Sequence, residues 1–247
     1  MSIRPAHISD AEWQVRVDLA AAYRLVAHFG WDDLIFTHLS ARIPDTDHHF
    51  LINPYGMMFH EITASSLVKV DQDGNIVADN GYRINPAGFT IHSAIHMARE
   101  DAGSVMHLHN HAGTAVSAQK NGLLPITQTA MLVYPRIAYH DYEGVALNLD
   151  ERERIVQDLR DKDIMILRNH GTLTLGKTVA EAFTLMYFLE NACEKQLRAQ
   201  AGGELHFPSQ AAIETTREQS SMLPKVSTLV WPGLIRLLDH KDSSYRS

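Results

Sequence analysis

The sequence predicts a single α/β domain around a mixed β-sheet, with helices on both faces of the sheet. Segments in which apolar and polar residues alternate are interleaved with segments whose apolar residues recur at helical spacing. Turn signals typical of hairpins separate several of the alternating segments, which indicates antiparallel pairing in part of the sheet. The sequence contains no internal repeat, low-complexity tract or linker, so one domain over residues 1–247 is expected.

The first half of the chain predicts two helices and five strands. Apolar side chains at helical spacing predict a helix over residues 10–29, which can end at Gly30, and a second helix over 89–100. The Asp73–Gly74 pair between two β-rich stretches is a strong hairpin signal. The expected strands are residues 34–43, 48–54, 103–109 and two short strands within 65–78.

The second half predicts mainly helices. Residues 178–203 have the clearest helical pattern, with a capping box formed by Thr178 and Glu181 and a stop at Gly202. An apolar strand over 163–171 ends in a sharp turn. The other expected elements are a helix over 113–122 closed by Gly122, a helix over 151–160, and a helical C-terminal tail over 209–247 that breaks at Trp231–Pro232.

Composition narrows the classes of partner. The net charge of −7 argues against nucleic acid and anionic membrane surfaces, because both recruit basic patches. The sequence has no apolar run near the roughly 20 residues that span a bilayer. Cys193 is the single cysteine, so an intramolecular disulfide is impossible and a reducing cytoplasm is the expected location.

Histidine is enriched, and three of the 15 histidines lie in the stretch "VMHLHNHAG". Alternate side chains of a strand point to the same face, so His107 and His109 project together with Cα atoms about 6.6 Å apart. Two imidazoles at this spacing can converge on one metal ion at Zn–N distances of about 2.0–2.1 Å. His170 follows an apolar strand, where a third ligand could be placed. The alternative is that His107 and His109 are polar residues on a half-exposed strand.

The motifs "NPYG", "HLHNHAG" and "RNHG", in this order, resemble the class II aldolase/adducin family over residues 10–205. The resemblance implies a three-layer α/β/α sandwich on a mainly antiparallel sheet and a homotetramer with active sites near subunit interfaces. It also implies a divalent metal bound by His107, His109 and His170. Zn²⁺ is the expected metal, and Mn²⁺ or Fe²⁺ stay open.

The sequence departs from the sugar-phosphate aldolases of this family at two places. Their S-S-E-type motif, which supplies phosphate-binding serines and a catalytic glutamate, corresponds to "PAG" here, with Gly88 at the carboxylate position. Their T-x-G-N phosphate loop corresponds to "FTHLS". A phosphorylated substrate is therefore not expected.

The resemblance also suggests residues that line a substrate pocket. His38 and Ser40 lie on the strand matching the phosphate-side wall, where the alternative is an ordinary polar strand face. Asn53, Tyr55 and Gly56 belong to the "NPYG" loop, which is otherwise a simple turn. Together with Gly88, these five residues are the expected substrate-binding set.

Two further residues are candidates for acid–base catalysis. Tyr142 belongs to a polar cluster before Gly144 and could donate a proton, or it could lie on a surface loop. His111 could act directly or support the metal ligands. His92 and His96 are four residues apart on one helix face, but His92 matches a position that is not a ligand in the relatives, so a packed histidine is expected there.

These observations predict a metal-dependent carbon–carbon lyase of aldolase or decarboxylase type, acting on a small non-phosphorylated oxo- or hydroxy-acid. The metal would stabilise an enolate. Two alternatives remain open: a non-catalytic adducin-like interaction module, and a mononuclear non-haem iron oxygenase built on the same three histidines.

Overall fold

An eight-stranded sheet forms the centre of the computed structural model, which describes residues 4–46, 48–78, 80–144 and 150–247. The strands follow one another across the sheet in the order β4-β3-β2-β1-β5-β8-β7-β6. Every neighbouring pair is antiparallel except β6 and β7, which confirms the mainly antiparallel mixed sheet. The strands are β1 (His38–Arg42), β2 (Phe50–Ile52), β3 (Val68–Val70), β4 (Ile76–Ala78), β5 (Ser104–Leu108), β6 (Ile137–His140), β7 (Ile164–Leu167) and β8 (Gly171–Gly176).

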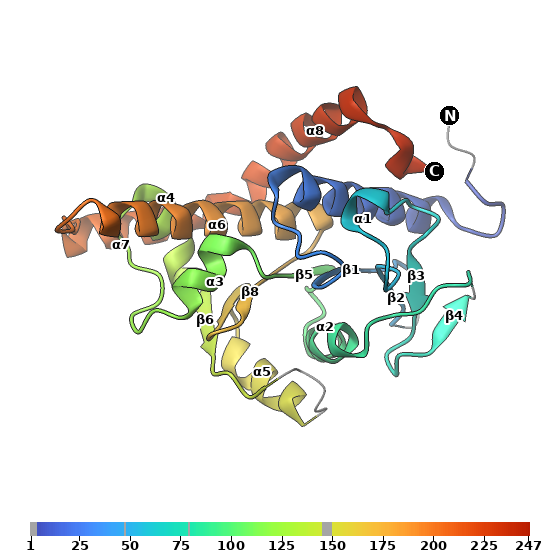
Figure 1. Ribbon diagram of the computed structural model, residues 1–247, viewed down its shortest axis with the longest axis horizontal. Helices are drawn as coiled ribbons and strands as arrows, with labels where there is room; N and C mark the ends of the chain where they lie inside the picture. The colour runs from blue at the N-terminus through green and yellow to red at the C-terminus, as the bar shows by residue number, and fades with distance from the viewer. Residues whose placement is uncertain (1–3, 47, 79, 145–149) are drawn as a thin grey trace.

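Helices cover both faces of this sheet, so the expected three-layer sandwich is confirmed. Figure 1 shows α1, α6 and α8 on one side of the sheet and α2 and α5 on the other. The helices are α1 (Asp10–Phe29), α2 (Pro86–Ala98), α3 (His111–Ser117), α4 (Gln128–Val133), α5 (Glu151–Leu159), α6 (Val179–Ala201), α7 (Gln210–Gln219) and α8 (Leu223–Lys241). Short 3-10 helices cover Phe59–Glu61, Tyr134–Arg136, Ser220–Met222 and Ser244–Arg246.

The alternation along β5 divides the core between the two helical layers. Met106 and Leu108 pack into the apolar cluster that contains α1 and α6. Val105 points the other way, into the cluster formed by α2, α5, β7 and β8. His107 therefore faces the α2 side of the sheet, because side chains alternate along a strand.

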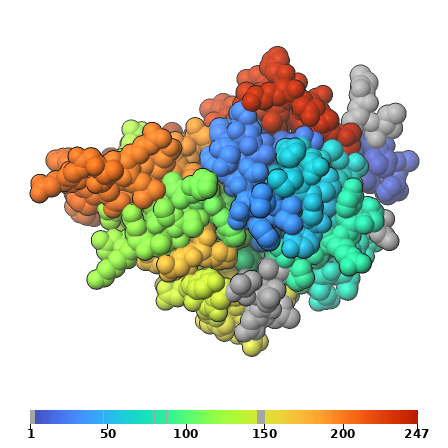
Figure 2. Space-filling view, viewed as in Figure 1, coloured from blue at the N-terminus to red at the C-terminus, as the bar shows by residue number. Residues whose placement is uncertain are grey.

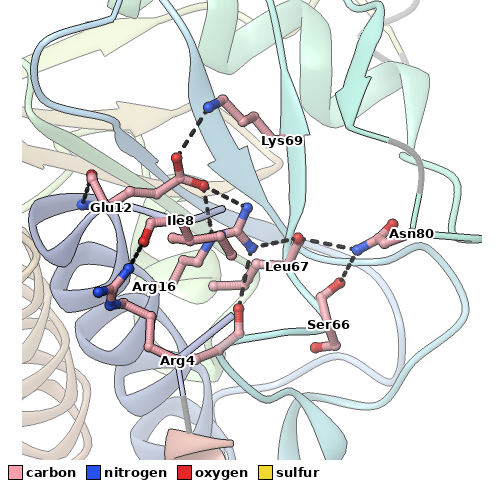
Figure 3. A network of polar contacts seen from close by, with 10 residues as sticks. Arg4, Ile8, Glu12, Arg16, Ser66, Leu67, Lys69 and Asn80 are labelled. Atoms are coloured by element: carbon pink, nitrogen blue, oxygen red, sulfur yellow. Dashed lines mark hydrogen bonds and ion pairs between the residues drawn. The ribbon is translucent and has the colours of Figure 1, made fainter. Parts of the chain in front are cut away.

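A buried polar network fixes α1 to the β2–β3 region (Figure 3). Arg16 donates to the carbonyls of Ala64 and Leu67 at 3.2 and 2.9 Å, and it pairs with Glu12 one turn earlier. Lys69 of β3 reaches Glu12 Oε2 at 3.0 Å. Burial alone raises the pKa of Glu12, but the hydrogen bonds from Lys69 and Arg16 outweigh it and leave the pKa lowered. The helix is thereby held in a set orientation across the sheet.

Most expected elements occur within a few residues of their predicted bounds. The helix over 10–29 ends at Gly30 in the left-handed conformation, and the two N-terminal hairpins form as β1–β2 and β3–β4. The expected turn between the strands at 34–43 and 48–54 includes residue 47, which lies outside the described residues. The strands β6 and β8 and the helix α4 were not predicted.

Two details of the predicted helices are wrong. The capping box of α6 is half formed: Thr178 accepts from the Glu181 N–H at 3.2 Å, but the Glu181 carboxylate accepts from the Lys177 N–H. The helix expected over 113–122 ends at Ser117 as α3, because residues 119–122 form a turn closed by a hydrogen bond from the Gly122 N–H to the Gln119 carbonyl.

The predicted break at Trp231–Pro232 is also wrong, because α8 runs through Pro232. Proline inside a helix costs about 3 kcal/mol, so other contacts must outweigh it. Trp231 donates to Asp18 of α1 at 3.1 Å, and Trp231, Leu234 and Ile235 pack on the core cluster of α1 and α6.

The C-terminal segment lies over the rest of the molecule. Figure 2 shows α8 lying over α1, and the C-terminal part of α6 projecting from the body together with α7. In the described part of the chain, none of the helices has the length and apolar character needed to cross a membrane.

Candidate metal centre

The central strand β5 provides the first two candidate ligands. His107 pairs in register with His38 of β1 and with Leu173 of β8, which places it in the middle of the sheet. His109 follows directly after the strand ends at Leu108. The strand period predicted that these two side chains lie close together, and their ring centroids are 5.0 Å apart.

The third candidate ligand comes from the turn between β7 and β8. Leu167 pairs with Gly171, so only three residues connect the two strands. Asn169 adopts the left-handed conformation with a φ of 56°, and the His170 N–H donates to the Leu167 carbonyl at 3.1 Å. This tight turn brings the His170 ring to within 4.7 Å of His107 and 4.9 Å of His109, measured between centroids.

The three histidines form a compact triad. Each offers a ring nitrogen, and the three nitrogens all lie within 4.8 Å of one another. Burial, followed by the neighbouring histidines, lowers the pKa of His107 well below its usual value and that of His170 to about 4. Both rings are therefore neutral near pH 7, and the neutral imidazole is the form that binds metal.

Hydrogen bonds on the far side of two rings orient the triad. His107 Nδ1 donates to the Thr172 carbonyl at 3.1 Å, and His109 Nδ1 donates to the Asp33 carboxylate at 2.9 Å. Metal-binding histidines are typically held in this way, because the second hydrogen bond fixes the tautomer and makes the ligand nitrogen more basic. In the neutral His107 ring, Nε2 therefore carries no proton, and in His109 Nε2 is the ring nitrogen that Asp33 leaves for another partner.

One buried atom shows most directly that a divalent metal fits these residues. His109 Nε2 is buried, and none of the described residues forms a hydrogen bond with it. Burying a polar nitrogen without a partner costs free energy, so such atoms are rare in native structures. A metal ion bound by the triad would satisfy this nitrogen.

Two residues that support the triad were not predicted from the sequence. Asp33 lies 76 residues before His109, and the acidic "DD" pair gives no sign of its partner. A Cβ at Gly171 would lie 2.5 Å from the Leu108 carbonyl oxygen and 3.1 Å from His109 Cδ2. Only glycine therefore allows β8 to approach the ligand-bearing end of β5, and its place directly after His170 was a usable signal.

The position of the missing carboxylate is occupied by a histidine ring. A Cβ at Gly88 would lie 2.4 Å from His38 Cδ2 and 2.7 Å from His38 Nε2. The His38 ring also lies 5.3 Å from that of His107. Gly88 and His38 are thus complementary, because a β1 side chain fills the space that a side chain at residue 88 of α2 would occupy.

The other expected substrate-binding residues have different surroundings. Ser40 is buried, and its hydroxyl contacts His92 and His96. Asn53 is buried, and its side-chain oxygen accepts from the Tyr23 hydroxyl at 2.9 Å. Tyr55 is partly exposed, and Gly56 follows it with a φ of 103°. Ser40 thus links β1 to α2 and Asn53 links the end of β2 to α1, and a substrate contact by any of these residues stays a prediction.

The two candidate acid–base residues lie in different places. The Tyr142 ring is 6.2 Å from that of His170, so this tyrosine borders the triad. His111 is exposed at the start of α3 and lines an open cavity of about 620 Å³ with Trp31, Tyr187 and Glu190. None of the three candidate ligands lines that cavity. The structure brings Tyr142 to the triad and does not bring His111 there.

The α/β/α sandwich and the histidine triad at the ends of its central strands together point to one class of proteins. The model of the Class II Aldolase and Adducin N-terminal domain matches residues 17–197. The chain therefore belongs to the class II aldolase and adducin family, as its motifs predicted.

Relatives of this chain include both aldolases and adducins. A Caulobacter vibrioides protein, named only provisionally as a class 2 aldolase, is 59% identical over 96% of this chain and 94% of its own. Rat alpha-adducin is 47% identical over 194 residues, which are 76% of this chain and 26% of the adducin.

Two solved structures share the whole fold. An aldolase II superfamily protein from Pseudomonas syringae is 52% identical, with a TM-score of 0.95 and 98% of each chain covered. The L-fuculose 1-phosphate aldolase from Glaciozyma antarctica is 29% identical, with a TM-score of 0.84 and coverage of 99% of this chain and 97% of that one.

Proposed function

We propose that this protein is a metal-dependent carbon–carbon lyase for a small, non-phosphorylated oxo- or hydroxy-acid. The observation that carries the proposal is the triad of His107, His109 and His170, in which the buried Nε2 of His109 has no partner among the described residues. Three protein ligands leave a coordination position for water or substrate, as catalytic sites do. The similarity to an L-fuculose 1-phosphate aldolase supports lyase chemistry.

The chemistry divides between the metal and the chain. When bound, a divalent cation supplies a Lewis acid that polarises a carbonyl oxygen and stabilises the charge developing there. Tyr142, whose ring lies 6.2 Å from that of His170, would give a proton to the carbon that has lost its substituent. Gly88 carries no carboxylate base, which favours decarboxylation, because the departure of CO₂ needs no base to begin it.

The same residues support a non-phosphorylated substrate. Gly88 replaces the carboxylate, and the serines beside it are replaced by proline and alanine in "PAG". The space next to Gly88 holds the neutral His38 ring, which has no positive charge to offer a phosphate. Weak binding of sugar phosphates is therefore expected.

The similarity to alpha-adducin supports one alternative, a non-catalytic interaction module. An iron oxygenase using the same triad is the other. Metal analysis of tag-free protein purified without air separates Zn²⁺ or Mn²⁺ from Fe²⁺. Turnover separates a lyase from an interaction module.

The first experiment is a screen of the metal-loaded protein against oxo- and hydroxy-acids, beside L-fuculose 1-phosphate. We expect turnover of at least one acid, loss of that turnover in His107→Ala, and negligible cleavage of the sugar phosphate. A general base contributes about 10²–10⁴-fold, so its absence should be plain in this assay. Robust cleavage of the sugar phosphate would contradict the proposed substrate class.

Assembly as a homotetramer is part of the proposal and rests on the family resemblance. Light scattering at micromolar concentration tests it directly. A monomer would exclude an active site completed by a neighbouring subunit.

A further inference from the structure

A chain of four buried polar side chains leads away from the candidate metal centre. It consists of His38 and Ser40 on β1 and His92 and His96 on α2, and we call it the histidine chain. His38 Nδ1 lies 3.0 Å from His92 Nε2, and His92 Nδ1 lies 2.5 Å from Ser40 Oγ. Ser40 Oγ is 2.7 Å from His96 Nε2, and His96 Nδ1 is 3.0 Å from the Ala102 carbonyl oxygen.

The far end of the histidine chain fixes the direction of its first hydrogen bonds. A carbonyl oxygen can only accept, so His96 Nδ1 must carry a proton and donate to Ala102. Burial, followed by nearby Arg42, lowers the pKa of His96 to about 3, so its ring is neutral and Nε2 is an acceptor. The single hydroxyl hydrogen of Ser40 must therefore point to His96 Nε2.

The same reasoning also fixes the protons of the next two members of the histidine chain, His92 and His38. Ser40 has already donated its hydrogen, so it can only accept from His92, which must be protonated at Nδ1. Burial lowers the pKa of His92 well below its usual value, so His92 is neutral and its Nε2 accepts from His38 Nδ1. His38 is buried between the rings of His92 and His107, which disfavours a second proton and leaves its Nε2 without one.

This last nitrogen faces the candidate site. His38 Nε2 lies beside Gly88, 2.7 Å from the point where a Cβ would stand. The His38 ring is 5.3 Å from that of the candidate ligand His107, and His109 and His170 are close enough to influence it electrostatically. Among the described residues, no donor forms a hydrogen bond with His38 Nε2.

We propose that the histidine chain fixes His38 as its Nδ1–H tautomer, so that His38 Nε2 offers a lone pair to the substrate. The site then selects substrates with a hydroxyl group that donates a hydrogen bond to His38 Nε2. This inference rests on the proposed function for the location of the substrate. It identifies the hydroxy-acids, rather than oxo-acids or acids without a hydroxyl group, as the class that the site recognises. A deprotonated oxygen placed against this lone pair would be repelled, whereas a hydroxyl group would be bound.

The tautomer can be tested without any activity. Neutron diffraction from a deuterium-exchanged crystal of the wild-type protein at pH 7.5 shows which ring nitrogens carry a proton. We expect density for deuterium at Nδ1 of His38, His92 and His96 and none at their Nε2 atoms. Deuterium at His38 Nε2 would overturn the inference.

The substrate preference needs a binding measurement with the zinc-loaded protein. Glycolate and methoxyacetate both have a carboxylate and an oxygen on the neighbouring carbon. This oxygen belongs to a hydroxyl group in glycolate and to an ether in methoxyacetate, so only glycolate can donate a hydrogen bond from it. A net hydrogen bond predicts that glycolate binds about fivefold more tightly by calorimetry. Glycolate also chelates metal better, so the control is His38→Phe, which keeps the ring and removes the lone pair.

The outcomes separate the two proposals. The inference is supported if the wild type prefers glycolate and this preference falls in His38→Phe at unchanged metal content. It is overturned if the wild type shows no preference or if the preference survives the substitution. Should His38→Phe fail to fold, the neutron density still decides the tautomer. If the tautomer and the preference are found but no acid is turned over, the lyase proposal fails and the recognition of hydroxyl donors stands.

Discussion

Two groups of histidines lie side by side in this protein and differ in where their ring nitrogens point. In the triad, the Nδ1 atoms of His107 and His109 are occupied by Thr172 and Asp33, and the remaining nitrogens converge. In the histidine chain, both ring nitrogens of His92 and His96 are taken up by other groups. His92 and His96 therefore have no ring nitrogen available for a metal, whereas the triad has three.

The difference shows that burial alone does not identify a metal ligand. His92 and His107 are equally buried, and burial lowers the pKa of both well below the usual value. What separates them is the number of hydrogen-bond partners, because a neutral imidazole with two partners has no lone pair left for an ion. His38 belongs to both groups, since one nitrogen enters the histidine chain and the other faces the triad.

The largest effect is expected from removing a triad histidine. His109→Ala deletes one of three ligands and should weaken Zn²⁺ binding by more than the roughly 100-fold that loss of an outer-shell partner can cause. Competition titration with a chromophoric chelator measures this affinity. The matched control is His92→Gln, in the histidine chain, which should keep the metal. Equal losses in both variants would contradict the separation of the two groups.

The sequence predicted the triad because each ligand has a local signal. The strand period aligns His107 with His109, and the apolar strand before His170 places that residue at a sharp turn. The packed role expected for His92 is confirmed by its two hydrogen bonds. The pairing of His38 with the gap at Gly88 could not be predicted, because it depends on the distance between β1 and α2.

The sequence predicted the elements that have a long periodic pattern of apolar residues, and it missed the short elements. The long helices α1 and α6 extend over many turns, so their apolar spacing is clear. The four-residue strand β6 is too short to show a period, and its parallel pairing with β7 depends on the rest of the sheet. The run of α8 through Pro232 likewise depends on contacts with α1 that no local signal encodes.

A smaller effect on the triad is expected from Asp33. Asp33→Ala removes the acceptor that holds His109 Nδ1–H and should lower Zn²⁺ affinity by about 10–100-fold, the range typical of such partners. The neighbouring carboxylate provides the control, because Asp32→Ala makes the same change in charge one residue away. The same titration should find Asp32→Ala close to the wild type. If the two variants lose affinity equally, the effect is long-range charge and not the orientation of His109.

The smallest effect is expected in the histidine chain and concerns stability against pH. Burial, followed by Arg42, lowers the pKa of His96 in the folded protein to about 3. In the unfolded chain His96 has the usual histidine pKa of about 6.5, so the unfolded chain binds this proton at a higher pH than the folded protein does. The contribution of a neutral His96 to stability is therefore fully present above about pH 6.5 and is lost as the pH falls toward 3. Between pH 6.5 and 5.5 the loss is about 1 kcal/mol for this one histidine.

The variant His96→Asn tests this, because asparagine can keep a donor and an acceptor but does not titrate. Urea unfolding at pH 7.5, 6.5 and 5.5, with metal removed by a chelator, gives the free energy of unfolding at each pH. The variant should be less stable than the wild type at pH 7.5, and the gap should narrow by about 1 kcal/mol between pH 6.5 and 5.5. His60→Asn, which replaces an exposed histidine, shows how much of the change comes from replacing any histidine. A constant gap between His96→Asn and the wild type would mean that His96 takes up its proton without unfolding. A charged His96 would donate from both nitrogens, so the order of hydrogen bonds that fixes His38 would then be lost at acidic pH.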